Sequence, residues 1–228
     1  MPSTPWTVIS LGGSIIVPDG IDTTFLREFS TLIRTHVARG MKFIIIAGGG
    51  KTSRRYQDAA RDLGDTSTED LDWLGIHATR LNGHLMRSVF RDLAHPALIK
   101  DPMAPIPDKS IVIAAGWKPG WSTDYVAVQL AKGAGATRLV NLSNIDYVYT
   151  ADPKKNPGAT KIEKTTWSDF RALLPDHWDP GLSSPFDPVA AKDAEESGIE
   201  VAVIKGTSTT DLNAYLSGST FNGTLIKD

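Results

Sequence analysis

The sequence contains no cysteine in its 228 residues, which excludes disulfide bonds, thiolate metal sites and thiol nucleophiles. No apolar run approaches the ~20 residues that a membrane-spanning helix needs. Residues 1–6 also lack the basic region followed by an apolar one that begins a secretion signal. We therefore expect a cytoplasmic protein with no membrane partner.

A strong charge of either sign is also missing. The 24 Lys and Arg residues nearly balance the 26 Asp and Glu residues, and the formal net charge is −2. Such a composition gives no general attraction for nucleic acid, so we expect no nucleic-acid partner and only local recognition of phosphate. No internal repeat stands out, and the length suits one continuous core. We expect a single domain over residues 1–228.

What the sequence does contain is an apolar run that ends abruptly in glycine. Residues 43–47 are Phe-Ile-Ile-Ile-Ala, and residues 48–51 are Gly-Gly-Gly-Lys. This pattern predicts a buried strand and then a bare turn at the start of a helix, where uncovered amide groups form an anion site. A P-loop would need glycine in place of Ile45, and a dinucleotide fingerprint would need glycine in place of Ser53. A tight strand-to-helix turn that binds nothing is the alternative.

A second turn of the same kind occurs earlier in the chain. Residues 6–11 predict a strand that runs straight into residues 12–14, Gly-Gly-Ser. A helix capped by Asp22 or Thr23 is expected to continue to about Arg39 and to join this strand to the next. A strand, a helix and a second buried strand form a right-handed parallel crossover, so both turns should lie at the carboxyl edge of one sheet. Ligands of open α/β sheets bind at that edge, and two bare turns there could hold two parts of one polyphosphate.

The rest of the chain continues to alternate helices and strands. It predicts a three-layer α/β/α sandwich with a central, mainly parallel sheet of about eight strands. Residues 175–188 are expected to form a proline-punctuated loop, and residues 223–226 an edge strand. The other expected helices cover residues 51–63, 68–93, 124–134, 165–174 and 209–216, with one more opening at residue 187, and the other expected strands cover residues 110–115, 138–142 and 200–204.

The helix expected after Lys51 has apolar residues at helical spacing. Tyr56, Ala59, Ala60 and Leu63 are predicted to lie on its inner face. The long helix over residues 68–93 is expected to contribute core residues and subunit contacts.

Four basic residues near these helices invite a functional interpretation. Arg54 and Arg55 stand in the first turn of a helix, where cations oppose the macrodipole, so one of them is expected to bind an anion. Solvated surface arginines are the alternative. His77 and His84 are interpreted as surface or interface residues, because no His-x-x-x-His pair occurs, and we expect no metal site.

Several segments, in their order and spacing, carry a resemblance to a known family: Gly12-Gly13-Ser14, Gly48-Gly49-Gly50-Lys51, Ser122-Thr123-Asp124, Asn144 to Pro157, and Asp187-Pro188-x-Ala190-Ala191-Lys192. The chain resembles the amino acid kinase superfamily over nearly its whole length. Within the superfamily it is most similar to the archaeal-type uridylate (UMP) kinases. Tyr149 to Pro157 is the most specific match, and Leu74 to Asn82 also fits that branch.

This resemblance implies transfer of a phosphoryl group from ATP, with Mg²⁺, to UMP. It divides the chain into an acceptor-binding half, about residues 1–135, and an ATP-binding half, about residues 136–228. It also implies a homo-oligomer, either a dimer or a hexamer of dimers, with small-molecule nucleotides as partners.

The resemblance also implies roles for individual residues. Gly13, Ser14 and Lys192 would be catalytic, with Lys192 neutralising the transition state. ATP would be bound by Gly12, Gly13, Ser14, Gly50, Arg54, Ser143, Asn144, Tyr149 and Asp152. The acceptor would be bound by Gly49, Asp72, Trp117, Lys118, Gly120, Trp121, Ser122 and Thr123.

Two segments depart from the family pattern. Trp117, Lys118 and Trp121 stand in the acceptor loop where this branch has smaller or imidazole side chains, and Tyr147 stands where glycine is usual. The indoles would either stack on a base or fill the acceptor pocket, and Tyr147 would narrow the ATP cleft or change the backbone. Two alternatives to a UMP kinase therefore stay open: a kinase for another small phosphate or carboxylate, and a nucleotide- or oxyanion-binding storage protein.

Overall fold

The structure is a computed structural model that describes residues 5–174 and 184–228. Most of the proline-punctuated loop expected over residues 175–188 therefore lies outside the described residues. Within the described ranges, no helix is both long enough and apolar enough to cross a membrane.

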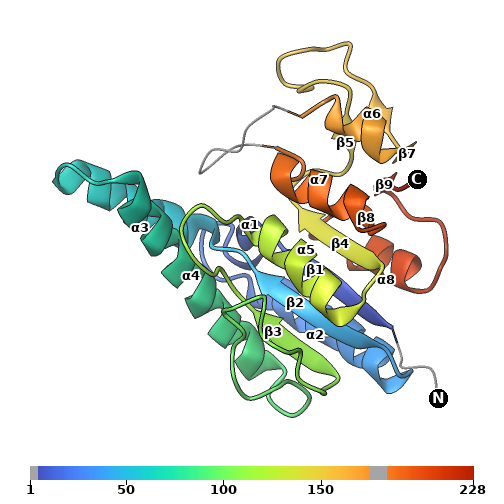
Figure 1. Ribbon diagram of the computed structural model, residues 1–228, viewed down its shortest axis with the longest axis horizontal. Coiled ribbons are helices and arrows are strands. Elements are labelled where there is room, and N and C mark those ends of the chain that lie inside the picture. Colours follow the sequence, from blue (N-terminus) through green and yellow to red (C-terminus); the bar gives the residue numbers. More distant parts are fainter. Residues whose placement is uncertain (1–4, 175–183) are drawn as a thin grey trace.

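A central sheet of seven strands organises the molecule (Figure 1). Five neighbouring strands run parallel, as the sequence predicts. They form a near-continuous apolar layer because helices cover both faces of the sheet. In sheet order the strands are β3 (Ile111–Ala114), β2 (Lys42–Ala47), β1 (Trp6–Leu11), β4 (Arg138–Ser143), β8 (Glu200–Lys205), β9 (Thr224–Ile226) and β7 (Lys164–Thr165).

The carboxyl-terminal side of the sheet differs from the prediction. The sequence pattern places the strand near residue 225 at the edge, but β9 lies between β8 and β7 and runs antiparallel to β8. β7 has only two residues, too few to show a strand period in the sequence. A separate antiparallel pair, β5 (Val148–Tyr149) and β6 (Lys161–Ile162), also went unpredicted for this reason.

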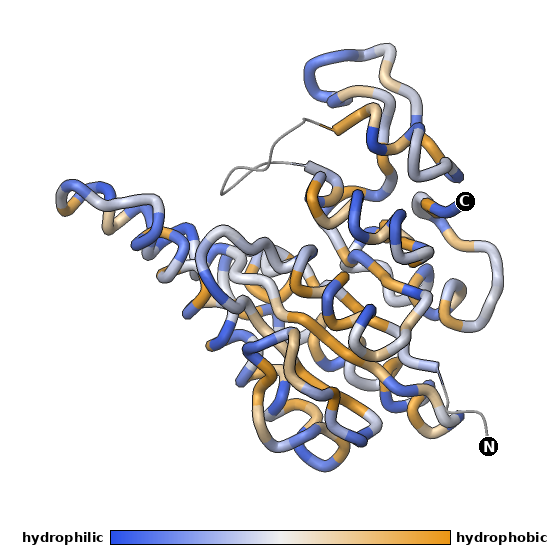
Figure 2. Tube along the Cα trace, in the orientation of Figure 1, coloured by the Kyte–Doolittle hydropathy of each residue, from blue (hydrophilic) through white to orange (hydrophobic). Residues whose placement is uncertain are grey.

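Helices cover both faces of the sheet and create two cores. Alternate strand residues point to opposite faces, so Ile9 and Ile45 join one core while Val8 and Ile44 join the other. In Figure 2 the hydrophobic colour follows the central strands. The first core is covered by α1 (Gly13–Ile16), α2 (Thr23–Ala38), the end of α4 (Thr68–Val89) and α8 (Thr209–Leu216), and the second by α5 (Thr123–Ala134), α6 (Trp167–Arg171) and α7 (Pro188–Glu196).

Side-chain caps fix the starts of three helices, among them the predicted cap at Asp22. The Asp22 side chain accepts a hydrogen bond from the Phe25 amide at 2.9 Å and so begins α2. Ser122 caps α5 in the same way, and Asp187 caps α7 just before Pro188. Each cap satisfies an amide that has no partner within its own helix, which fixes where the helix starts.

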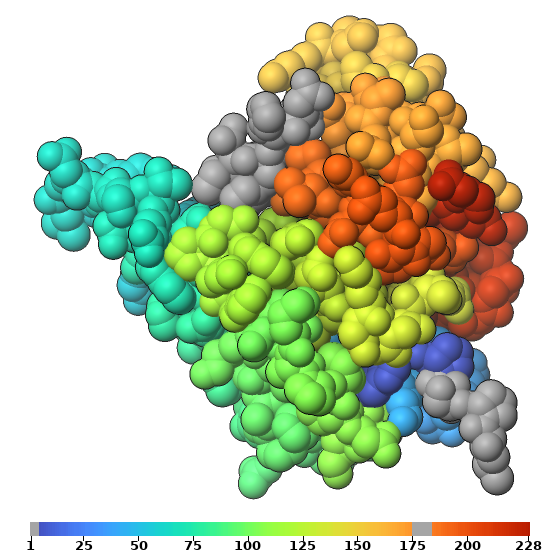
Figure 3. Space-filling model, in the orientation of Figure 1, coloured from blue at the N-terminus to red at the C-terminus, as the bar shows by residue number. Residues whose placement is uncertain are grey.

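Helix α3 (Gly50–Leu63) contradicts one expectation. The side chains of Tyr56 and Leu63 are 63% and 89% exposed, and α3 contains no buried residue. The predicted inner face of α3, which also included Ala59 and Ala60, is therefore wrong. Figures 1 and 3 show the reason: α3 and the first half of α4 form an arm that projects beyond the sheet, so the sheet cannot cover them. Helix α4 also ends at Val89, four residues before its predicted end.

The two glycine turns touch each other, as their places at one edge of the sheet require. β1 and β2 are parallel neighbours, so both turns leave the sheet at the same edge. A Cβ atom built on Gly13 would lie 2.0 Å from the Gly50 nitrogen, and one built on Gly50 would lie 2.1 Å from the Gly13 carbonyl oxygen. No side chain fits between the two backbones. Close packing is therefore one reason for glycine here, beside any role in binding.

We predict that Gly13→Ala lowers the free energy of unfolding by about 3 kcal/mol or more, because the added methyl group overlaps the Gly50 backbone. Urea denaturation measures this change. Gly20→Ala is the matched control, since a Cβ atom at Gly20 meets nothing within 4 Å. Equal stability of the two variants would show that the turns are not in tight contact.

Candidate active site

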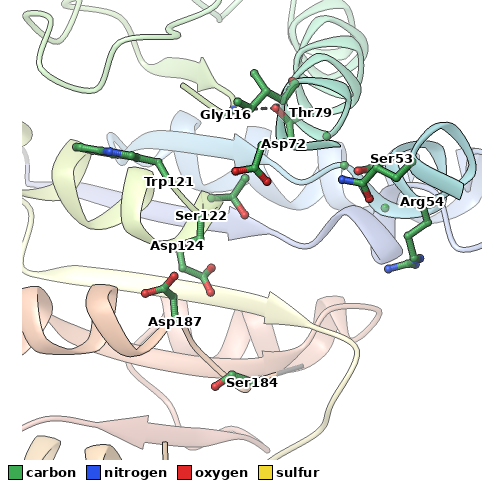
Figure 4. Close-up of a pocket in the computed structure, with 16 residues that line it drawn as sticks. Ser53, Arg54, Asp72, Thr79, Gly116, Trp121, Ser122, Asp124, Ser184 and Asp187 are labelled. Atoms are coloured by element: carbon green, nitrogen blue, oxygen red, sulfur yellow. Dashed lines mark hydrogen bonds between the residues drawn. The ribbon is translucent and has the colours of Figure 1, made fainter. Parts of the chain in front are cut away.

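A cavity of about 400 Å³ opens at the carboxyl edge of the sheet, next to the turn that follows β2 (Figure 4). The starts of α3, α5 and α7 and one side of α4 surround it. Seven of the residues predicted to bind ATP or the acceptor line this cavity together. They are Gly49, Gly50, Arg54, Asp72, Trp121, Ser122 and Thr123.

The other predicted residues lie outside the cavity lining. Gly12, Gly13 and Ser14 form the neighbouring turn, with Gly13 against Gly50. Trp117, Lys118 and Gly120 belong to the loop behind the Trp121 wall. Four residues of the expected ATP-binding half, Ser143, Asn144, Tyr149 and Asp152, and the predicted catalytic Lys192 also lie outside the lining.

Local hydrogen bonds hold the expected ATP-binding residues. The Tyr149 hydroxyl donates to Asp146 Oδ1 at 3.3 Å, and the Lys205 ammonium donates to the Asn144 carbonyl at 2.8 Å. Asp152 accepts from the Lys154 amide at 3.0 Å, the geometry of an ordinary Asx turn. These contacts order the segment without revealing a ligand, so its role in binding ATP stays a prediction.

Tyr147 neither blocks the cavity nor strains the backbone. Its hydroxyl donates to Asn222 Oδ1 at 3.1 Å, and the Lys161 ammonium lies 4.7 Å from the centre of its ring. No described residue other than glycine has a positive φ, so tyrosine at this position does not adopt a glycine-like backbone. Tyr147 instead links the segment before β5 to the segment before β9.

The cations near the glycine turn divide into two groups. Lys51 and Arg55 both form ion pairs with Asp19, at 3.3 and 3.0 Å. Arg54 lines the cavity and forms no ion pair with any residue in the described ranges. Of the two arginines considered in the sequence, Arg54 is therefore the one placed to meet an anion in the cavity.

Two carboxylates that the sequence indicated only as residues of helix starts form the lower wall of the cavity in Figure 4. Asp124 stands in the first turn of α5, and Asp187 is the cap of α7. Ser10 of β1 donates a hydrogen bond to Asp124 Oδ1 at 3.0 Å. Burial raises the pKa of Asp124 to about 6, and repulsion from Asp187 adds to the increase, while the hydrogen bond from Ser10 opposes it. Asp124 therefore keeps its proton to a higher pH than an ordinary aspartic acid does.

Lys192 points to solvent on α7. Its side chain is 62% exposed, and its ammonium lies 3.9 Å from Glu196. The start of α7 reaches the cavity through Asp187, whereas Lys192 is one turn further along. The catalytic role of Lys192 stays a prediction.

Helix α4 and neighbouring elements supply lining residues that sequence reasoning missed. Helix α4 contributes Gly75, Ile76 and Thr79. They follow Asp72 at helical spacing, so they lie on the same side of α4, and this spacing was the sequence signal that could have found them. Ser53 and Gln57 lie on α3 at the same spacing. The other missed lining residues are Gly116, Asp124, Ser184 and Asp187.

The raised pKa of Asp124 predicts a pH effect on stability. Because its pKa is higher in the folded protein than in the unfolded chain, charging Asp124 opposes folding as the pH rises from about 4 to about 6. Asp124→Asn removes this effect. We expect the variant to gain about 2 kcal/mol relative to wild type between pH 4 and pH 7, measured by urea denaturation. A stability difference between variant and wild type that stays constant over this pH range would contradict the raised pKa of Asp124. The control is Asp169→Asn, at an exposed position of α6.

Comparison with known proteins supports the family resemblance. The sequence profile described as "Amino acid kinase family" matches residues 5–205. The uridylate kinase of Methanothrix thermoacetophila is 35% identical, covering 96% of this chain and 98% of its own. The uridylate kinase of Pyrococcus abyssi is also 35% identical, covering 86% of this chain and 88% of its own.

Solved structures show the same arrangement. The crystal structure of uridylate kinase from Archaeoglobus fulgidus superposes with a TM-score of 0.81 at 32% identity, covering 96% of this chain and 99% of that one. The UMP kinase structure from Bacillus anthracis has a TM-score of 0.79 at 21% identity, which supports the fold alone. The profile match, the full-length relatives and the shared arrangement of strands agree, and the chain belongs to the amino acid kinase family.

Proposed function

We propose that this protein is a uridylate kinase, which transfers the γ-phosphoryl group of ATP to UMP and releases UDP. The observation that carries this proposal is the near full-length match to archaeal uridylate kinases at 32–35% identity. The cavity beside the glycine turns also supports it, because residues that the family resemblance assigns to both substrate sites line it together. A cytoplasmic location and the use of Mg²⁺ belong to the same proposal.

The acceptor nucleotide occupies the cavity in this proposal. Asp72 offers its carboxylate to the ribose hydroxyls, and Trp121 borders the space for the base. Ser122 and Thr123 lie at the start of α5, where a hydroxyl and backbone amides suit the acceptor phosphate. Arg54 shares this cavity, so we place its guanidinium at the junction of the acceptor and the transferred phosphate.

ATP binds on the other side of the paired glycine turns in this proposal. The short helix α1 begins at Gly13, and the amides of Gly13 and Ser14 are available to phosphate oxygens. The nucleoside part lies near Ser143, Asn144, Tyr149 and Asp152 at the carboxyl end of β4 and beyond, as the family resemblance implies. Gly12 and Gly50 complete the contact with the phosphates.

The chemistry requires alignment and charge stabilisation more than covalent participation by the protein. The phosphoryl group passes between two oxygens, so the protein holds both nucleotides in line and balances the charge of the transferred group. Mg²⁺ supplies positive charge to the phosphates when it is bound, and the oxygens of Asp124 and Asp187 are the ligand type that it prefers. Lys192 turns toward the phosphates in this proposal, and its exposed contact with Glu196 costs little to break.

A coupled enzyme assay tests this function. We expect UDP from UMP and ATP with Mg²⁺, and we expect Lys192→Ala to lower kcat at least about 100-fold while ATP binding changes less than about threefold, because a transition-state contact is lost. Lys227→Ala, at an exposed lysine that pairs with Glu200, is the control. ADP release with another small acceptor, but not with UMP, would show that this other acceptor is the substrate. Binding of ATP without turnover of any acceptor would favour a storage protein.

A different acceptor is the second candidate, and one observation favours it. The Trp117 and Trp121 rings lie 4.5 Å apart at a right angle, and Lys118 lies over both. Bulky groups therefore form and back the Trp121 wall, at positions where the family resemblance implies smaller or imidazole side chains. A panel of nucleoside monophosphates and small carboxylates distinguishes this candidate in the same assay.

We also propose a homo-oligomer, either a dimer or a hexamer of dimers, in which copies meet through the projecting arm of α3 and α4. Tyr56 and Leu63 are seven residues apart, so they lie on one side of α3, and both are exposed together with Leu81 of α4. Exposed apolar side chains that gather on one element are typical of interaction surfaces.

Light scattering after size-exclusion chromatography tests the assembly. We expect wild type to have at least twice the monomer mass, and we expect the double variant Tyr56→Glu, Leu63→Glu to approach the monomer mass, because charge would be buried at the contact. Met103→Glu, at another exposed apolar side chain, should leave the mass unchanged. A monomeric wild type would overturn the proposal.

A further inference from the structure

Helix α4 holds the loop that joins β3 to α5 at both of its ends. The Gly116 amide donates a hydrogen bond to Thr79 Oγ1 at 2.8 Å. At the other end of the loop, the Gly120 amide donates to Asp72 Oδ2 at 2.9 Å. The bonds come from one helix, so the loop and the side of α4 form one connected unit.

Arg80 strengthens the first of these attachments. Its Nη2 donates to the Trp117 carbonyl at 2.8 Å, and its Nε donates to the Gly116 carbonyl at 3.3 Å. The planar guanidinium thus spans two successive carbonyl groups, which a lysine ammonium could not do in the same geometry.

The spacing on α4 explains how one helix reaches both ends of the loop. Asp72 and Thr79 are seven residues apart, almost two full turns, so they lie on the same side of α4. Seven residues of helix span roughly 10 Å along the axis. Arg80 follows Thr79 directly, and its longer side chain reaches past Gly116 to Trp117.

Arg80 has neutral partners only. Partial burial lowers its pKa, and no carboxylate in the described part of the chain forms an ion pair with it. The Trp73 ring centre lies 5.8 Å from the guanidinium carbon. The guanidinium is partly desolvated and donates to two carbonyls of the loop. The loop therefore fixes the position of Arg80, and Arg80 fixes the position of the loop.

The loop in turn determines the position of Trp121, which borders the cavity. Trp117 packs edge-on against Trp121, with ring centres 4.5 Å apart, and the Lys118 ammonium lies 4.2 Å from the centre of the Trp117 ring and 5.2 Å from that of Trp121. On its other side Trp121 meets Tyr125 of α5 at 4.4 Å. A displacement of the Trp117 backbone would therefore move the Trp121 wall.

We propose that Arg80 is a positioning residue for acceptor recognition: with Asp72 it clamps residues 116–120 to α4 and thereby fixes the Trp121 wall of the acceptor cavity. This inference rests on the proposed function for its kinetic consequence. The clamp itself is a property of the loop and can be measured without turnover. Arg80 does not itself line the cavity, and its side chain reaches the lining only through the loop backbone at Gly116.

The kinetic test compares Arg80→Met with Arg80→Lys. We expect Arg80→Met to raise KM for UMP about tenfold, with KM for ATP and kcat changed less than about twofold, and Arg80→Lys to recover part of the loss because it keeps a donor. Arg87→Met is the matched control, since Arg87 lies two turns further along the same side of α4 and its side chain makes no hydrogen bond with the described residues. Equal changes in KM for both substrates would overturn the positioning role.

Hydrogen–deuterium exchange provides the readout that is independent of activity. We expect the amides of residues 116–121 to exchange at least about tenfold faster in Arg80→Met than in wild type, with the β1 and β2 amides unchanged. Faster exchange throughout the protein, or no change in the loop, would overturn the clamp. If wild type fails to phosphorylate UMP, the proposed function fails, and this exchange experiment still decides the clamp.

Discussion

The direct contact between two backbone turns is the constraint on which the site depends. β1 and β2 are adjacent and parallel, and Gly13 and Gly50 meet where a side chain has no room. The Gly12 amide also donates to the Leu142 carbonyl at 2.9 Å, which ties the same place to β4. Three strands therefore fix the amides of both turns relative to one another before any ligand arrives. Such preorganisation is what phosphoryl transfer needs from a protein, because its catalysis depends on alignment and electrostatic stabilisation.

The charge around the cavity sets a second condition. Among the described residues that line it, Asp72, Asp124 and Asp187 are acidic and Arg54 alone is basic. An acidic cavity opposes the entry of a bare polyphosphate, whereas a cation carried with the nucleotide reduces the repulsion. The proposed function gives the two kinds of group separate roles: the glycine amides bind phosphate oxygens, and the carboxylates favour the accompanying positive charge.

The sequence predicted the sheet and the glycine turns because these depend on local patterns. The apolar run before Gly48, the cap at Asp22 and the alternation of elements are each readable within a few residues. The exposed face of α3 could not be read in this way, since Tyr56 and Leu63 have the spacing of a buried face but extend past the sheet. Asp124 was visible as a residue of a helix start, yet its raised pKa comes from burial and from repulsion by Asp187, which is distant in the chain. Burial and charge at the site arise from tertiary contacts, and no local pattern encodes them.

The place of β1 in the sheet has a consequence for how the chain acquires its structure. β1 pairs with β2, which follows after one helix, but also with β4, where Thr7 aligns with Arg138. The second pairing closes a very long loop, and such non-local pairings slow folding. Until β4 arrives, the apolar Val8 and Ile9 belong to an unprotected strand edge, which is prone to pair with other chains. The sheet built by the first 114 residues thus needs β4, from the second half of the chain, to complete its centre. Synthesis must pass residue 143 before that strand edge is protected from aggregation.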